Sequence, residues 1–294
     1  MDRKDFLKFL ALTPLGGLAM NLSDISALAQ SKDSSDKMPT LFIGHGSPMN
    51  GIENNEYSNY WKKLAEQIPQ PKAVICISAH WLTKGTLVTA MSHPKTIHDF
   101  GGFPQALFDV QYPAPGSLTT AIETQNAISS TKVELDHDWG LDHGTWTIIR
   151  HMYPKANIPV LQLSIDYDKP AQYHYNLAKE LHKLRRKGIL LIGSGNMVHN
   201  LRMIAWDKMN TPNFGFDWAI EMNQKFKSSI LDHNHQALIN YQNFGVAAKN
   251  AIPTPDHYYP LIYTLGLQEK TDKVEIFNDK LVMGSLTMTS VKMF

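Results

Sequence analysis

The sequence predicts an α/β fold: a single domain whose mostly parallel central sheet is flanked by helices and followed by C-terminal β-strands. Three short apolar runs, bounded by glycine or polar residues, predict buried parallel strands over Leu41–Gly44, Ala73–Ser78 and Gly188–Gly193. The segment Ala171–Arg186 has apolar residues at helical spacing and joins a strand predicted over Pro159–Ile165 to the strand that begins at Gly188. This strand–helix–strand order is typical of parallel pairing.

The other elements follow from periodicity and turn signals. A helix over Tyr57–Gln67 ends before Pro69, and the C-terminal region alternates apolar and polar side chains, as half-buried strands do. Two long connections, 90–117 and 243–260, are expected to be functional, because long loops inside compact domains usually are. The further predicted elements are helices over Phe216–Leu231 and Pro260–Leu265, a strand over Lys273–Phe277, a turn at Asn278–Asp279 and alternation from Leu281 to Met293.

Composition excludes several kinds of partner. The 294 residues include 28 Lys and Arg against 27 Asp and Glu, so no charge excess favours nucleic acid or an anionic membrane. Beyond the N-terminal segment no apolar run is long enough to span a bilayer, and we expect no stable membrane association. The single cysteine, Cys76, excludes intramolecular disulfides and disfavours a thiolate metal site. The 13 histidines offer imidazole ligands, which suit zinc and iron.

The N-terminus has the three-part pattern of an export signal. A charged start containing Arg3 and Lys4 precedes an apolar stretch, Phe9–Met20, and Ala27–Ala29 offers a cleavage site. Arg3 and Lys4 resemble a twin-arginine signal with lysine in the second place, which predicts an exported, periplasmic protein. The alternative is a cytoplasmic protein whose N-terminus is an amphipathic helix or a disordered tail. The expected organisation is a removed signal at 1–29, a polar linker at 30–37 and one folded domain over 38–294.

Three histidines follow predicted strands at equivalent ends. His45 comes directly after the first strand, His80 follows the second, and His199 lies beyond the third. In open α/β sheets, ligands bind beyond the carboxyl ends of the strands, so these imidazoles are expected to meet at a metal site. The alternative for each one alone is a structural histidine. His257, in a loop stiffened by three prolines, is a weaker candidate ligand.

Two further segments suit the chemistry of such a site. His143 lies in an Asp-His-Gly sequence between tryptophans, where a neutral imidazole can act as a general acid or base. The alternative is that His143 packs at the entrance of a helix. The segment His98–Pro104 is rich in glycine and aromatic residues, so it could form a wall or lid over a flat ring. A plain surface loop is the alternative for that segment.

Several motifs occur in order from about Met38 to the C-terminus. They are Gly44–Pro48, Ser78–Trp81, His98–Pro104, Tyr112–Gly116, Asp142–Gly144, Gly195–Asn196 with Val198–Asn200, and Pro253–Pro255 with His257–Tyr258. Together these motifs resemble the 4,5-DOPA extradiol dioxygenase family, which belongs to the class III extradiol ring-cleaving dioxygenases. The resemblance implies a catalytic domain of that class over 38–294, and the N-terminal segment lies outside it.

The resemblance also implies a role for each matching histidine. His45, His80 and His257 match metal-ligand positions. His199 matches a position described as a further ligand or as an acid/base, and His143 matches an active-site histidine. One divalent metal ion per chain, Zn(II) or Fe(II), is implied. Fe(II) enzymes of this class commonly use two histidines and one glutamate, whereas the third position here is His257, and an all-histidine set also fits zinc.

The implied reaction opens a catechol ring, such as that of DOPA, with O2 beside the diol to give a muconic semialdehyde. The expected partners are therefore a small-molecule catechol and O2, and a homo-oligomer is compatible with the sequence. His143 or His199 would be the base. The aromatic side chains expected to pack the ring are Trp81, Phe100, Phe103 and Trp146.

Two other functions fit the same histidines. A zinc hydrolase would use metal-bound water and would need a carboxylate base, for which Asp142 and Asp256 are the candidates. A non-catalytic zinc-binding protein would not need the aromatic, glycine-rich loops. Oxygen consumption with a catechol separates these functions from ring cleavage.

Overall fold

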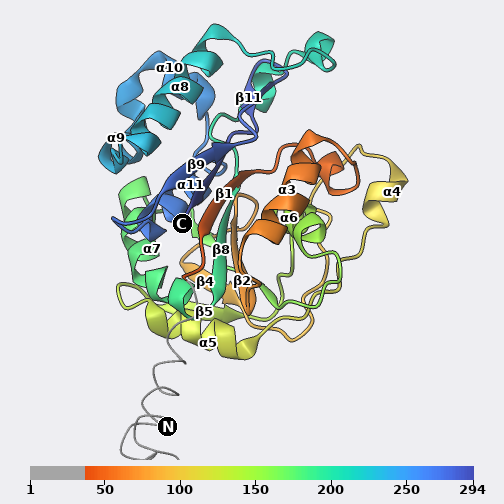
Figure 1. Ribbon diagram of the computed structural model, residues 1–294, viewed down its shortest axis with the longest axis vertical. Coiled ribbons are helices and arrows are strands. Elements are labelled where there is room, and N and C mark those ends of the chain that lie inside the picture. Colours follow the sequence, from red (N-terminus) through yellow and green to blue (C-terminus); the bar gives the residue numbers. More distant parts are fainter. Residues whose placement is uncertain (1–36) are drawn as a thin grey trace, which may run out of the picture. The chain divides into compact units, whose positions relative to one another are not determined.

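The computed structural model describes residues 37–294 and is built around a six-stranded sheet of order β6-β2-β8-β1-β12-β9 (Figure 1). The first four strands in that order are parallel, β12 runs antiparallel to β1, and β9 runs antiparallel to β12. The predicted mostly parallel sheet with C-terminal strands is therefore confirmed. The predicted export signal, 1–29, and all but the last residue of the linker lie outside the described residues. The strands of the sheet are β1 Thr40–Gly44, β2 Ala73–Ser78, β6 Val160–Gln162, β8 Ile189–Gly195, β9 Val274–Phe277 and β12 Ser290–Met293.

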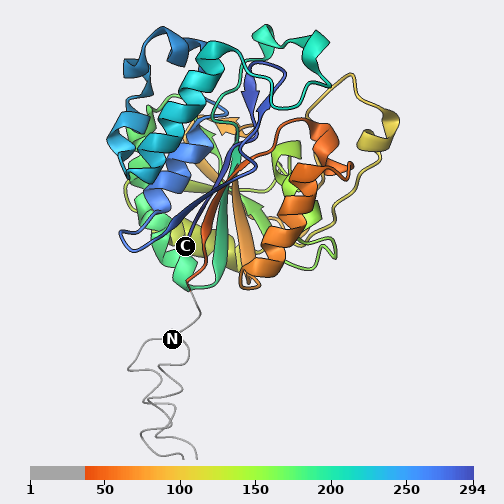
Figure 2. The same cartoon turned by 45° about the horizontal axis from the view of Figure 1, so that its top comes forward.

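Helices cover both faces of this sheet, which explains why its central strands are wholly buried. Side chains alternate along each strand, so Phe42 and Ile75 enter one core while Leu41 and Val74 enter the other. Helices α7 and α11 pack on the first face, and α3 and α6 pack on the second (Figures 1 and 2). These helices are α3 Glu56–Gln67, α6 His143–Met152, α7 Ala171–Arg186 and α11 Tyr259–Leu267.

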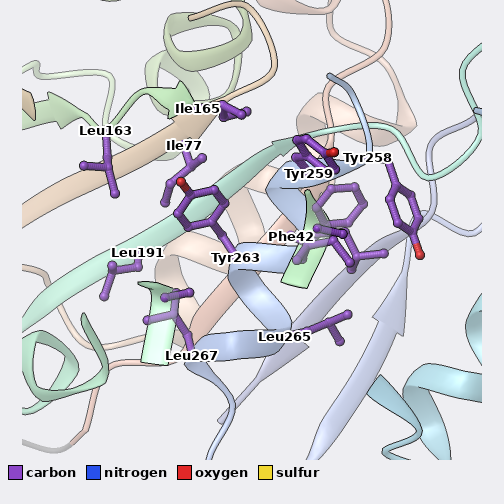
Figure 3. Packing of buried hydrophobic residues seen from close by; sticks show 14 of the residues in the cluster. Phe42, Ile77, Leu163, Ile165, Leu191, Tyr258, Tyr259, Tyr263, Leu265 and Leu267 are labelled. Carbon is purple, nitrogen blue, oxygen red and sulfur yellow. The ribbon is translucent and has the colours of Figure 1, made fainter. Parts of the chain in front are cut away.

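Close contact between α11 and the sheet positions one of the candidate ligands. Every residue of α11 is buried, and Figure 3 shows Tyr263 of this helix beside Phe42 and Leu191 of the sheet. A side chain at Gly195, the last residue of β8, would collide with the carbonyl oxygen of His257. Glycine at this position therefore lets the loop before α11 lie against the carboxyl end of β8.

Some predicted elements differ from the structure in extent. The strand predicted over Pro159–Ile165 is divided into β6 and β7, and the alternating region from Leu281 to Met293 is interrupted by a turn. In that turn Met283 and Gly284 have φ values of 50° and 84°, which a continuous strand does not allow. Strand β8 runs two residues beyond the prediction, because Ser194 and Gly195 pair with the end of β1.

Helix α5, Leu118–Ala127, has no counterpart in the prediction. It buries Thr120, Ala121 and Thr124, so its inner face lacks the apolar periodicity from which helices are recognised. The predicted long loop at 243–260 likewise contains a short helix, α10. The remaining elements are η1 Pro48–Gly51, β3 Leu82–Thr83, β4 Thr86–Thr89, α4 Gln105–Phe108, β5 Val133–Asp136, β7 Ile165–Asp166, η2 Leu201–Met203, η3 Trp206–Lys208, α8 Asp217–Leu231, α9 His235–Ile239, η4 Tyr241–Phe244, α10 Val246–Ala251, β10 Leu281–Val282 and β11 Leu286–Thr287.

A buried arginine connects the two ends of the described chain. The Arg185 guanidinium forms an ion pair with Asp272 at 2.6 Å, and both side chains are inaccessible to solvent. It also donates to the carbonyl oxygens of Met38, Leu267 and Met293. The start of the domain, the end of α11 and the last strand are thus held at one point. Within residues 37–294, no helix combines the length and hydrophobicity that crossing a bilayer requires.

Candidate metal centre and active site

The carboxyl edge of the parallel strands carries the candidate ligands. His45 is the first residue after β1, His80 is the second residue after β2, and His257 lies two residues before α11. His199 follows β8 by four residues and forms an isolated bridge with Leu286 of β11. Parallel strands bring their carboxyl ends to one edge of the sheet, which explains how residues so far apart in the sequence meet.

His45, His80 and His257 form one compact group. The Nε2 atoms of His45 and His80 are 3.2 Å apart, and one ring nitrogen from each of the three lies within 4.8 Å of the others. His257 has ring-centroid distances of 5.4 Å to His45 and 4.9 Å to His80. These three side chains could hold a metal ion.

His199 occupies an adjoining position. Its ring is stacked on that of His257, with a centroid distance of 3.5 Å and an interplanar angle of 4°. A ring nitrogen of His199 lies within 4.8 Å of ligand atoms of Asp256 and His257, and His199 is not a member of the group formed by His45, His80 and His257. The structure therefore separates His199 from the three-histidine group with which the sequence had placed it.

Hydrogen bonds determine which nitrogen of each ring is available. The Ser194 hydroxyl donates to the Gly144 carbonyl oxygen at 2.6 Å, so its oxygen is left to accept from Nδ1 of His45, 3.0 Å away. Nδ1 of His257 likewise donates to Asp256. In both rings the lone pair then lies on Nε2, where a metal can bind it, and such partners are typical of metal-ligating histidines.

Burial favours the neutral form of His45, His80 and His199. The pKa values of His45 and His80 are held well below the ordinary value, first by loss of hydration and then by neighbouring histidines. The same two causes lower the pKa of His199 to about 3. Metals bind the deprotonated nitrogen. Histidines with lowered pKa values therefore have unprotonated ring nitrogens that can bind a metal ion at neutral pH.

The donor set fits one divalent metal ion. Two nitrogens 3.2 Å apart, each bonded at about 2.1 Å to the same ion, would subtend about 100° at it. That angle lies between tetrahedral and octahedral geometry and therefore selects neither. Three imidazole ligands suit zinc and iron alike.

His143 lies beside this group, at the first residue of α6. Its ring centroid is 3.9 Å from that of His80 and 5.5 Å from that of His45. Asp99 accepts two hydrogen bonds from it, one from Nδ1 and one from the backbone N–H, each at 2.9 Å. The pKa of Asp99 is lowered, because its hydrogen bonds with His143 and the coulombic interaction with that ring outweigh the opposing effect of burial. The sequence prediction did not name Asp99, although its loop, His98–Pro104, had been singled out.

Asp142 holds the start of α6 in place. Its carboxylate accepts hydrogen bonds from the Thr145 backbone N–H, the Ser78 hydroxyl and the Gln162 amide at 3.1, 2.7 and 2.6 Å. The side chain is fully buried, and burial raises its pKa. The first of these bonds is an N-cap, which places His143 at the helix entrance expected as its alternative role. That position does not conflict with a catalytic one.

Only part of the predicted aromatic wall is accessible. Phe100 and Phe103 are half-buried, and Phe100 packs edge-on against His143 at 5.6 Å and against Phe103 at 5.4 Å. Trp81 is 3% exposed and stacks on Trp139, and Trp146 is not exposed at all. Both indoles therefore offer little surface to a substrate, and their contact with the ring stays a prediction.

Known proteins share both the sequence and the fold. Residues 39–293 match a family described as the catalytic LigB subunit of aromatic ring-opening dioxygenase. A protein of Escherichia coli (strain K12) named 4,5-DOPA dioxygenase extradiol is 46% identical over 264 residues, 88% of this chain and 96% of that one. A protein of the same name from Mirabilis jalapa is 33% identical over 245 residues, 81% and 90% of the two chains. The crystal structure of an uncharacterized protein from E. coli K12 superposes with a TM-score of 0.76 at 39% identity, covering 87% of this chain and 100% of that one.

Proposed function

Because the chain belongs to the LigB family of aromatic ring-opening dioxygenases and is an extradiol dioxygenase, we propose that it opens a catechol ring, such as that of DOPA, in a metal-dependent reaction with O2. Opening beside the diol would give a muconic semialdehyde. Family membership confirms the resemblance seen in the sequence motifs. The observation that most supports the metal dependence is the grouping of His45, His80 and His257 within 4.8 Å.

His45, His80 and His257 would hold the metal. A bound ion would supply Lewis-acid chemistry that lowers the pKa of a catechol oxygen, and would provide a site near which the ring and O2 meet. We propose Fe(II) as the active ion, because zinc has no redox chemistry and the insertion of O2 requires electron transfer.

His143 would be the base. Its Nδ1 is engaged by Asp99, and no group of residues 37–294 hydrogen-bonds to its Nε2, which is therefore free to take a proton from the catechol. His199 is the less favourable base, because its ring is stacked face to face on that of His257 and burial lowers its pKa. We propose that His199 instead supports His257 through the stacked contact, while Phe100 and Phe103 border the aromatic ring.

The arrangement gives little support to a zinc hydrolase. Such an enzyme needs a carboxylate free to act as base, but Asp256 accepts from His257 and Asp99 accepts two bonds from His143. Asp142 accepts three bonds in full burial. The carboxylates at the site are thus occupied in orienting other groups.

Loading the metal-free protein anaerobically with either Fe(II) or Zn(II) tests the proposal. We expect O2 uptake with DOPA or another catechol only in the Fe(II) form, with one O2 consumed per ring opened. His45→Ala should lose both bound metal and turnover, whereas His93→Ala, which removes an exposed histidine, should keep both. Equal turnover with zinc, or hydrolysis of an ester without O2 uptake, would contradict the proposal.

A further inference from the structure

We propose that Asp99 is a positioning residue that keeps the ring hydrogen of His143 on Nδ1. Nε2 then carries no hydrogen and can accept a proton from the substrate. This inference rests on the proposed function, in which His143 is the base. The proton passes from a catechol oxygen to Nε2, and the ionised Asp99 carboxylate stabilises the imidazolium that forms without taking the proton itself.

Both oxygens of Asp99 are committed to His143. Oδ1 accepts the backbone N–H and Oδ2 accepts Nδ1, each at 2.9 Å. A backbone N–H can only donate, so the bond from His143 holds Oδ1 of Asp99 in place and sets the orientation of the carboxylate. The other oxygen is thereby presented to the ring, where an ionised carboxylate can only accept. The tautomer of His143 with hydrogen on Nδ1 follows from these two contacts.

His80 is the weaker partner of the same carboxylate. Its Nδ1 lies 3.5 Å from Oδ2 of Asp99, beyond the usual range for a hydrogen bond between nitrogen and oxygen. The contact with His143 is shorter and is reinforced through the backbone. Asp99 should therefore act on the base more than on the metal ligand.

The loop that carries Asp99 is held from both sides. The Ile97 backbone N–H donates to the Leu141 carbonyl at 2.8 Å, and the Ile97 carbonyl accepts from the Trp146 indole at 2.9 Å. The ring of His98 bonds the Val110 carbonyl at 2.9 Å. The buried Trp146 thus has a structural role: it fixes the backbone two residues before Asp99. A base whose orientation is set before substrate arrives avoids a cost of ordering during the reaction.

The change Asp99→Asn tests the role with almost no change in shape. The amide has one acceptor oxygen, which the backbone N–H of His143 still requires, so its NH2 group must face Nδ1. An NH2 group can only donate, which forces the hydrogen of the ring onto Nε2 and disables the base. We expect kcat to fall by about 10²–10⁴-fold with little change in KM, in bound Fe(II) or in thermal stability.

Nitrogen-15 NMR of the histidines in the metal-free full chain reports the tautomer independently of activity. The His143 signals should show hydrogen on Nδ1 in the wild type and on Nε2 in Asp99→Asn. Asp109→Asn is the same exchange at the residue that follows α4, where the carboxylate accepts from the Gln105 side chain, and it should leave both the tautomer and kcat unchanged. If Asp99→Asn does not fold, Asp99→Ala with added formate replaces it, and formate should restore part of kcat.

Three outcomes would overturn the proposal: an unchanged tautomer, an unchanged kcat, or a loss of bound Fe(II) equal to that caused by Asp256→Asn. The last would show that Asp99 supports His80 rather than His143. If the wild type opens no catechol ring while the tautomer still changes as expected, the proposed function fails and the positioning role stands.

Discussion

Gly144 shows how tightly single atoms are packed around the candidate metal centre. A Cβ added there would lie 2.6 Å from the Ser78 hydroxyl and 2.9 Å from Cδ2 of His80. Ser78 cannot easily withdraw, because it donates to the buried Asp142. Glycine at this position is thus required by the ring of His80 and not by the local backbone, which is helical.

Gly144→Ala should displace His80 and weaken metal binding. We expect a loss of about 10–100-fold in metal affinity, the range found when groups that support a ligand are changed. Isothermal titration of the metal-free protein with Fe(II) or Zn(II) measures it. Gly101→Ala is the control, because a Cβ there meets nothing within 4 Å. Metal affinity equal to wild type in Gly144→Ala would show that the side chain at position 144 does not control the placement of His80.

Helices α7 and α11 are joined by a buried histidine. His174 of α7 is inaccessible to solvent and bonds through Nδ1 to the Tyr263 hydroxyl of α11 at 3.1 Å. Its Nε2 lies 3.2 Å from the Lys169 carbonyl oxygen. Burial lowers its pKa to about 4, although the hydrogen bond with the Lys169 carbonyl acts to raise it. The packing of the two helices therefore depends on a neutral ring.

His174 should make stability depend on pH. The folded state holds this group neutral down to a pKa of about 4, whereas the unfolded chain takes up the proton near pH ~6.5. Between these pH values the unfolded state binds more protons than the folded state. The contribution of His174 to the free energy of unfolding is therefore fully present above pH ~6.5, and it falls by about 3 kcal/mol in total as the pH decreases toward 4.

Urea unfolding of the metal-free protein across that range measures the dependence. Compared with wild type, His174→Gln should be less stable at neutral pH and should lose less of its stability on acidification. His137→Gln, at an exposed position, controls for the removal of a histidine and should retain the wild-type slope. Equal slopes for wild type and His174→Gln would disprove the assignment.

At the scale of the whole molecule, the chain consists of a folded domain and an N-terminal segment that the family match does not include. The Arg185 guanidinium holds Met38, Asp272 and Met293 together in the protein interior. The family match covers 39–293. Residues 1–29 lie outside that match, and we propose that they direct export to the periplasm.

Export predicts a shortened chain. We expect the mature protein to begin at Gln30 outside the cytoplasm, and cleavage to be lost when Arg3 and Lys4 are both changed to Gln. Mass spectrometry of the N-terminus after cell fractionation measures both. An intact Met1 in the cytoplasmic fraction would refute export. A control variant keeps Arg3 and Lys4 and instead changes Lys84 and Lys183, two surface lysines of the domain, to Gln. It loses the same charge and should still be cleaved.

The sequence alone determined the sheet and the edge at which the site lies. Strands β1, β2 and β8 are covered on both faces, so their apolar runs were recognisable without any knowledge of their neighbours. The rule that ligands bind at the carboxyl ends of such strands then located His45 and His80. His257 was only a weak candidate on its own, and the family resemblance rather than its local pattern joined it to the others.

Tertiary structure decided the partners of these histidines. Ser194 is 149 residues from His45 and Asp99 is 44 residues from His143, and no local pattern connects residues at such separations. The burial of Trp81 and Trp146 was equally beyond local reasoning, because aromatic side chains suit a core and a ring-binding wall alike. Local hydrophobicity determines which segments become strands, whereas hydrogen bonds and exposure depend on how distant segments pack together.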